Sequence, residues 1–169
     1  MLRQIILQWK PSMTTMLCLF GLLASGYCSF NARGWGDHID WKTLEEGKLE
    51  AQNSRKPMMI VVHKSWCGAC KALKPRFSTS SEIADLSRKF VMVNLEDEEE
   101  PKDQQYHIDG SYIPRIFFLD SFGVVQKDIT NKGGNPSYRY FYSNAESIVT
   151  SMKTALEQMT KDIHQAKEL

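Results

Sequence analysis

The segment from 64 to 75 reads KSWCGACKALKP and places two cysteines, Cys67 and Cys70, with two residues between them. Two sulfurs at this spacing serve as a structural disulfide, as half of a zinc site, or as a redox pair. A structural zinc takes four ligands, which here requires a second cysteine pair or two histidines at a matching spacing. The histidines instead stand singly along the chain: His38, His63, His107 and His164. The ligand count therefore disfavours zinc.

The spacing also disfavours a permanent structural disulfide between Cys67 and Cys70. The stabilisation that a disulfide provides grows with the length of the loop that it closes. This loop is very short, so the bond would contribute little stability. The spacing suits a bond that is formed and broken reversibly.

The position of the pair between two predicted elements supports redox chemistry. Residues 57–63, PMMIVVH, form an apolar run with β-branched side chains, typical of a strand buried on both faces. A helical pattern follows, so Cys67 lies where a helix begins and backbone N–H groups lack partners. Such a position stabilises a thiolate, the form of sulfur that attacks disulfides. We expect Cys67 to attack and the more buried Cys70, one turn further, to resolve the mixed disulfide.

Other segments predict the elements that hold this pair in place. Before the first strand, Trp41 and Ala51 fall on one face of a helix that ends at residues 55–57. After the cysteine helix, residues 79–82 form a capping box that begins another helix. Residues 90–95 then form a second buried strand.

The rest of the chain predicts a β-hairpin and a last helix. Residues 115–120 and 123–129 are expected to pair as an antiparallel hairpin. Residues 143–146 form a second capping box. The helix after it buries one stripe of side chains, made of Ile148, Met152, Ala155, Leu156 and Met159. Two parallel strands and a hairpin, covered by helices, define an α/β fold with a central mixed sheet flanked on both faces.

The first residues predict a secretory signal peptide. Residues 1–26 combine a basic start, a short apolar run at 16–24 and a small-residue exit. A membrane anchor is the alternative, but the run is well short of the roughly 20 apolar residues that a spanning helix needs. Cleavage anywhere from 26 to 29 would remove Cys18 and leave the fate of Cys28 open.

The balance of charged residues argues against some classes of binding partner. The 169 residues include 21 basic and 20 acidic side chains, so no net field directs the chain to nucleic acid or an anionic membrane. The acidic run at 96–100 does not match a calcium-binding EF-hand loop and predicts a solvated loop. The C-terminal tail, 161–169, ends in Glu168-Leu169, which matches a K-D-E-L retention signal only in its last two residues.

Together these motifs resemble the thioredoxin superfamily. The resemblance rests on WCGAC at 66–70 behind a buried strand, on Pro75, and on the Ile-Pro pair at 113–114. It covers residues 55–160 and implies a single thioredoxin-like fold, with 30–54 as an N-terminal extension and helix. Wider stretches such as HKSWCGACKALKP and YIPRIFFLD are similar to small endoplasmic-reticulum members of the protein disulfide isomerase family, close to the anterior gradient proteins.

The resemblance implies the chemistry and its setting. It implies that Pro75 kinks the cysteine helix and that a cis peptide precedes Pro114 beside Cys67, although an Ile-Pro bond by itself favours trans. It implies no metal, flavin or nucleotide cofactor, because the two sulfurs hold the electrons. The implied partners are glutathione and cysteine-containing client proteins of the secretory pathway. The implied location is the endoplasmic reticulum lumen, with secretion as the alternative because the retention signal is weak.

Further residues are expected to support the cysteines or to bind the client. The expected supporting residues are Lys64, Trp66, Gly68, Ala69 and Pro114, and the expected client-binding residues are Trp66, Tyr112, Ile113 and Pro114. The segment 110–114 would present its backbone to an extended client strand. Thioredoxins carry a buried acid six residues before the first cysteine, and here Val61 takes that position. Water or Lys64 is left to move the proton of Cys70.

Two functions fit this site. The first is a thiol–disulfide oxidoreductase that forms, reduces or rearranges disulfides, with a potential of roughly −170 to −250 mV. The second is a quality-control protein that captures clients as mixed disulfides with little turnover, which the missing acid at Val61 favours. Turnover after Cys70→Ala separates the two functions.

Overall fold

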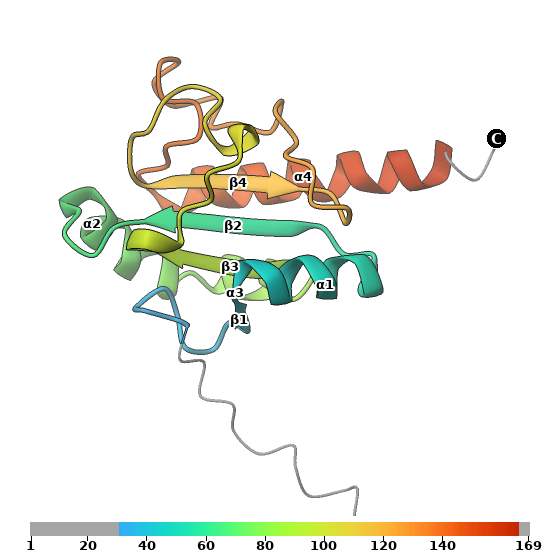
Figure 1. Cartoon of the computed structure of the whole chain (residues 1–169), viewed down its shortest axis with the longest axis horizontal. Coiled ribbons are helices and arrows are strands. Elements are labelled where there is room, and N and C mark those ends of the chain that lie inside the picture. The colour runs from blue at the N-terminus through green and yellow to red at the C-terminus, as the bar shows by residue number, and fades with distance from the viewer. Residues whose placement is uncertain (1–30, 166–169) are drawn as a thin grey trace, which may run out of the picture.

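The computed structural model describes residues 31–165, with side chains up to residue 159. Its sheet has four strands in the order β1-β3-β2-β4 (Figure 1). β1 (Trp41–Lys42) and β2 (Met58–His63) run parallel to β3 (Val91–Glu96), and β4 (Arg115–Leu119) runs antiparallel to β2. The predicted α/β fold with a mixed central sheet is confirmed.

Within residues 31–165, four α-helices cover the two faces of this sheet. Their bounds are α1 Leu44–Ser54, α2 Gly68–Ser78, α3 Ser81–Ser87 and α4 Ala145–Gln165. Alternate side chains of a strand point to opposite faces, so β2 contributes to two separate cores. Met59 and Val61 pack in the core formed with α2, α3 and α4, while Met58 and Ile60 pack in the core formed with α1. Figure 1 shows α1 and α4 on opposite sides of the sheet.

The start of the first helix differs from the prediction. Thr43 caps α1 through a capping box with Glu46, so the helix begins at Leu44 and does not include Trp41. Trp41 instead lies in β1, paired with Met92, and its indole N–H donates to the carbonyl of Gly36 at 3.0 Å. The side chain is buried as predicted, but the backbone pairing of residues 41–42 was missed.

Both predicted capping boxes are wrong by one residue. The Ser80 hydroxyl caps α3 by accepting from the backbone N–H of Ile83, whereas the Thr79 hydroxyl donates to the Pro75 carbonyl at the end of α2. At α4 the Asn144 side chain accepts from the N–H of Ser147 at 2.9 Å. The helices themselves, including the buried stripe of α4, are confirmed.

The second strand of the predicted hairpin does not form. Between these two predicted strands, which lie within the described residues, the pairing is one isolated antiparallel bridge that joins Leu119 to Val125. The Asp120 carboxylate accepts from the N–H groups of Phe122 and Val124 and closes a tight turn. Beyond Gln126 the chain turns again, which ends the pairing.

Several predictions fall outside the described residues. They concern the signal peptide at 1–26, Cys18, Cys28 and the C-terminal pair Glu168-Leu169. Within residues 31–165, no helix is both long and apolar enough to cross a membrane.

Candidate active site

Cys67 and Cys70 lie at the first turn of α2, directly after the end of β2. Cys67 is the N-cap residue, and its sulfur accepts a hydrogen bond from the Cys70 N–H at 3.2 Å. This contact satisfies one of the free N–H groups at the helix start. Cys67 is 6% exposed and Cys70 is 0% exposed, and neither sulfur forms a disulfide. Both cysteines are buried, and Cys70 is the more buried of the two by a small margin.

The environment of Cys70 disfavours its ionisation. Burial, followed by the hydrogen bond with Cys67, raises the pKa of the Cys70 thiol to about 12. The backbone N–H of Lys64 and the charge of Lys74 act in the opposite direction. The Cys70 thiol is therefore protonated at neutral pH, and its backbone N–H contacts the Cys67 sulfur.

The loop before β4 brings Pro114 and Ile113 to the cysteines. The peptide bond between Ile113 and Pro114 is cis, as the resemblance implies, so the trans preference of the isolated pair is overridden. The Cys67 thiol points to the carbonyl of Ile113 at 3.8 Å. Pro114 is buried, and Ile113 is partly buried against the core on the α1 side.

The aromatic residues expected at the client surface lie in two places. Trp66 is 72% exposed beside Cys67, as expected for the rim of a client site. The Tyr112 hydroxyl donates to Asp109 at 2.6 Å and accepts from the N–H of Tyr140 at 3.0 Å, which fixes the loop before Pro114. Tyr138 packs edge-on against Tyr112 with ring centroids 4.9 Å apart.

The remaining motif residues follow the helix start. Gly68 and Ala69 are exposed in the first turn of α2, and the space beside Gly68 is open, with nothing within 4 Å of a Cβ at that position. Pro75 lies inside α2, where it lacks the N–H that would bond one turn back. The surface beside the start of α2 is therefore open at Gly68.

The acidic run at 96–100 is solvated only in part, whereas a wholly solvated loop was predicted. Asp97 accepts from the N–H of Ser65 at 2.9 Å, Glu99 pairs with Arg33, and Glu100 pairs with Lys64 at 3.0 Å and with Arg115. Glu98 is exposed. The reason is the parallel pairing of β2 with β3, which places the ends of both strands side by side.

Glu100 joins the two loops on either side of the cysteine pair. Its Lys64 partner lies three residues before Cys67, and its Arg115 partner directly follows Pro114. Arg115 is fully buried and also donates to the carbonyls of Tyr106 and Gly110 at 2.5 and 2.9 Å. The sequence did not single out Glu100 or Arg115, because their contacts depend on sheet register.

The Lys64 side chain is committed to this network. Its ammonium binds Glu100 and donates to the carbonyl of Asp97 at 2.5 Å. Nothing in these contacts directs the Lys64 ammonium to Cys70, so its predicted part in moving the Cys70 proton has no support from the geometry. Val61 is buried in the apolar core and supplies no carboxylate.

His63, the last residue of β2, is buried and neutral at neutral pH. Desolvation by burial lowers its pKa to about 4. Its Nε2 lies 2.7 Å from the side-chain oxygen of Asn94, so the neutral ring donates there. The Asn94 amide in turn donates to the carbonyls of Asn31 and Ala32. This chain of contacts ties the N-terminal segment to the sheet behind the cysteines.

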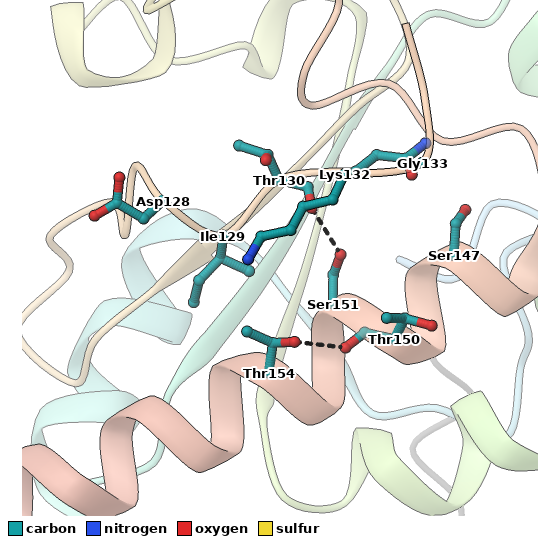
Figure 2. Close-up of a pocket in the computed structure, with 10 residues that line it drawn as sticks. Asp128, Ile129, Thr130, Lys132, Gly133, Ser147, Thr150, Ser151 and Thr154 are labelled. Carbon is teal, nitrogen blue, oxygen red and sulfur yellow. Dashed lines mark hydrogen bonds between the residues drawn. The ribbon is translucent and has the colours of Figure 1, made fainter. Parts of the chain in front are cut away.

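A separate hollow of about 220 Å³ lies between α4 and the segment 128–133 (Figure 2). Its hydroxyl groups bond to neighbouring carbonyls: Thr154 donates to Thr150 at 3.0 Å, and Ser151 to Thr130 at 3.2 Å. Neither cysteine lines the hollow. Among the described residues, no group of three or more His, Cys, Asp or Glu side chains could hold a metal ion.

The fold and the cysteine pair define a thioredoxin-like protein. A family model described as thioredoxin-like matches residues 40–121. The solved structure of the DsbH oxidoreductase superposes with a TM-score of 0.51 at 18% identity, covering 70% of this chain and 85% of that one. At this identity the superposition shows the fold.

Sequence comparison identifies the family within that class. Anterior gradient protein 3 of Mus musculus is 38% identical over 134 residues, which cover 78% of this chain and 80% of that protein. The anterior gradient protein 2 homolog of Homo sapiens is 36% identical over 133 residues, covering 78% and 75%. The chain belongs to the anterior gradient family, and the resemblance found in the sequence is confirmed.

Proposed function

We propose that this protein is a thiol–disulfide oxidoreductase that forms, reduces or rearranges disulfides in client proteins. The observation that carries the proposal is the Cys67 sulfur at the N-cap of α2, with the Cys70 N–H bonded to it at 3.2 Å. A thiolate is the reactive form in disulfide exchange, and a helix start stabilises it. The name of the DsbH oxidoreductase, which shares the fold, is consistent with this chemistry.

The reaction takes place in two exchanges. The Cys67 thiolate attacks one sulfur of a client disulfide, which forms a mixed disulfide and releases the other client sulfur as a thiolate. Cys70 then loses its proton and attacks the Cys67 sulfur, which forms the Cys67–Cys70 disulfide and releases the second client sulfur. Two electrons pass to the client, and the two released sulfurs take up protons. Glutathione reduces the protein again, and the reverse sequence inserts a disulfide into a client.

The proposed substrate surface consists of the exposed Trp66 side chain and of the loop that contains Ile113 and Pro114. Trp66 is exposed beside Cys67 and offers an apolar contact to the residues around a client cysteine. Ile113 and Pro114 lie opposite, with the Ile113 carbonyl 3.8 Å from the Cys67 sulfur. An extended client strand at 110–114 would lie within reach of the attacking sulfur.

The proposed location is the lumen of the endoplasmic reticulum, and the proposed clients are secretory proteins with cysteines. The support is the signal-peptide pattern of residues 1–26, together with the weak retention-like ending. Expression of the full chain in secretory cells tests the location. We expect a processed N-terminus between 26 and 29, with the protein divided between the cell lysate and the medium. An unprocessed, cytosolic chain would contradict it.

Turnover with a peptide disulfide and reduced glutathione tests the chemistry. The wild type is expected to reduce many equivalents of peptide, and Cys67→Ala none. Cys70→Ala is expected to accumulate the mixed disulfide and to lose the two-sulfur route. A single turnover isolates this role, with reduced protein and peptide disulfide and no other thiol present. Release of the second peptide thiol from Cys70→Ala at the wild-type rate would refute the resolving role of Cys70.

A second function has one observation in its favour. Because burial raises the pKa of Cys70 to about 12, release of a bound client through Cys70 is opposed by the site itself. A protein with slow release would hold clients as mixed disulfides and act in quality control. Mixed disulfides that persist in the wild type over minutes, with fewer than about one turnover in that time, would favour this function.

A further inference from the structure

The second exchange needs the Cys70 thiolate, and burial opposes its formation. The Cys70 side chain is fully buried, and position 61 carries the apolar Val61. A nearby positive charge favours the charged form of a thiol. The candidates for this charge are therefore the basic side chains around the first turns of α2.

Lys74 lies four residues after Cys70 and thus on the same face of α2. Side chains at this spacing are neighbours, with Cβ atoms about 5–6 Å apart. The Lys74 side chain does not extend into solvent, since it is 19% exposed. Its Cδ lies 3.5 Å from the point where a Cβ on Gly34 would stand, and its ammonium lies 6.0 Å from the centre of the Trp35 ring.

The N-terminal segment therefore holds Lys74 against the protein. Trp35 is fully buried, and its ring packs against those of His63 and Phe77 at 5.2 and 5.3 Å between centroids. The N-terminal segment 31–40 thus covers the side of α2 that carries the resolving cysteine. A lysine confined in this way keeps its charge near the helix rather than in bulk water.

The carboxylate that pairs with Lys74 is Glu96 at the end of β3, with 3.6 Å between Nζ and Oε1. Glu96 also faces Arg33 at 3.9 Å and the neutral ring of His63 at 3.4 Å. Arg33 is held in addition by Glu99. Because Glu96 is shared between two cations, it offsets the Lys74 charge only in part.

We propose that Lys74 promotes the resolving step by stabilising the Cys70 thiolate, and that Glu96 moderates this effect. Lys74 acts through Cys70 and does not touch the client, so it is a positioning residue. The proposal rests on the two-cysteine function described above. In its balanced form, the Cys70 thiol and the Cys67–glutathione disulfide give the Cys67–Cys70 disulfide and free glutathione thiol. The Cys70 proton is released first and is taken up by the departing glutathione sulfur.

The test follows the Cys67–glutathione mixed disulfide in time. The reduced protein is mixed with excess glutathione disulfide, quenched with acid at intervals and analysed by mass spectrometry. Lys74→Met is expected to slow the decay of the mixed disulfide about threefold to tenfold at neutral pH, as for a shift of about half to one pKa unit. Lys74→Arg is expected to restore the rate and Glu96→Gln to raise it, and an unchanged rate in Glu96→Gln would refute the moderating part of Glu96.

Two controls separate a charge effect from a general disturbance. Lys71→Met removes an equal charge from an exposed position of the same helix and is expected to change the decay less than about twofold. Lys74→Met in a Cys70→Ala background is expected to leave the rate of mixed-disulfide formation at Cys67 within about twofold.

Each result supports or overturns the role of Lys74. Equal decay rates for Lys74→Met and Lys71→Met would overturn it. A loss in Glu96→Gln as large as in Lys74→Met would show a structural role for the pair instead. A wild-type protein that forms the mixed disulfide but never releases glutathione would refute the two-cysteine function, and the inference with it.

Discussion

Replacement of Glu100 by glutamine should destabilise the protein, because Glu100 is the carboxylate partner of a fully buried arginine. Arg115 is 0% exposed, and desolvation lowers the pKa of its guanidinium, which shows that burial opposes its charge. Breaking a buried ion pair costs about 3–5 kcal/mol. Glu100 is 19% exposed, and the carbonyls of Tyr106 and Gly110 still accept from Arg115. Both facts reduce the expected loss to about 2–3 kcal/mol.

Urea denaturation at neutral pH measures this loss in the free energy of unfolding. Glu98→Gln is the matched control, since Glu98 is exposed on the same segment and should change stability by less than about 0.5 kcal/mol. Lys64→Met removes only the partly exposed partner and should cost about 1 kcal/mol or less. Stability of Glu100→Gln within error of Glu98→Gln would refute the reasoning that Arg115 depends on this carboxylate.

Three further predictions concern pH, packing and client binding. His63 has a folded pKa of about 4, below the ordinary 6.5, so the wild type should lose up to about 3 kcal/mol as pH falls from 6.5 to 4. His63→Gln should show a flatter stability profile over that range, and parallel profiles would argue against the assignment. A Cβ at Gly47 would lie 2.4 Å from Cγ2 of Val93, so Gly47→Ala should cost about 1–3 kcal/mol despite its better helix propensity. Thermal unfolding checks this, and Val93→Ala in the same chain should recover part of the loss. Trp66→Ala should leave stability within about 0.5 kcal/mol but raise the KM for a peptide disulfide. Equal effects on the peptide and on glutathione disulfide would place Trp66 outside the client surface.

The parts of the fold that sequence predicted well depend on residues close together in the chain. The buried strand before Cys67, the helix after it and the stripe of α4 follow from local hydrophobic periodicity, and the structure contains all three. The errors lie at boundaries, where two adjacent residues compete for one role. Ser80 rather than Thr79 caps α3, because the Thr79 hydroxyl is already bonded to the end of α2.

The residues around the cysteines were harder to predict, since their contacts join distant segments. Glu96 pairs with Lys74, and Glu100 pairs with Lys64 and Arg115, only because parallel pairing of β2 and β3 aligns the two strand ends. The sequence held one signal for these ion pairs, namely acidic residues after one strand and basic residues after another strand. Without knowledge of the strand register, however, the acidic run predicts only a solvated loop.

The sequence by itself determined the reactive element of this protein: a cysteine at a helix start with a second cysteine one turn later. That arrangement is local, because a strand, a cap and one helical turn are specified by neighbouring residues. Only the tertiary structure decided which charges face the sulfurs, how deeply Cys70 is buried, and that the Ile113 carbonyl lies beside Cys67. These features depend on strand register and on packing between segments far apart in the chain, and hydrophobic periodicity within one segment carries no information about either.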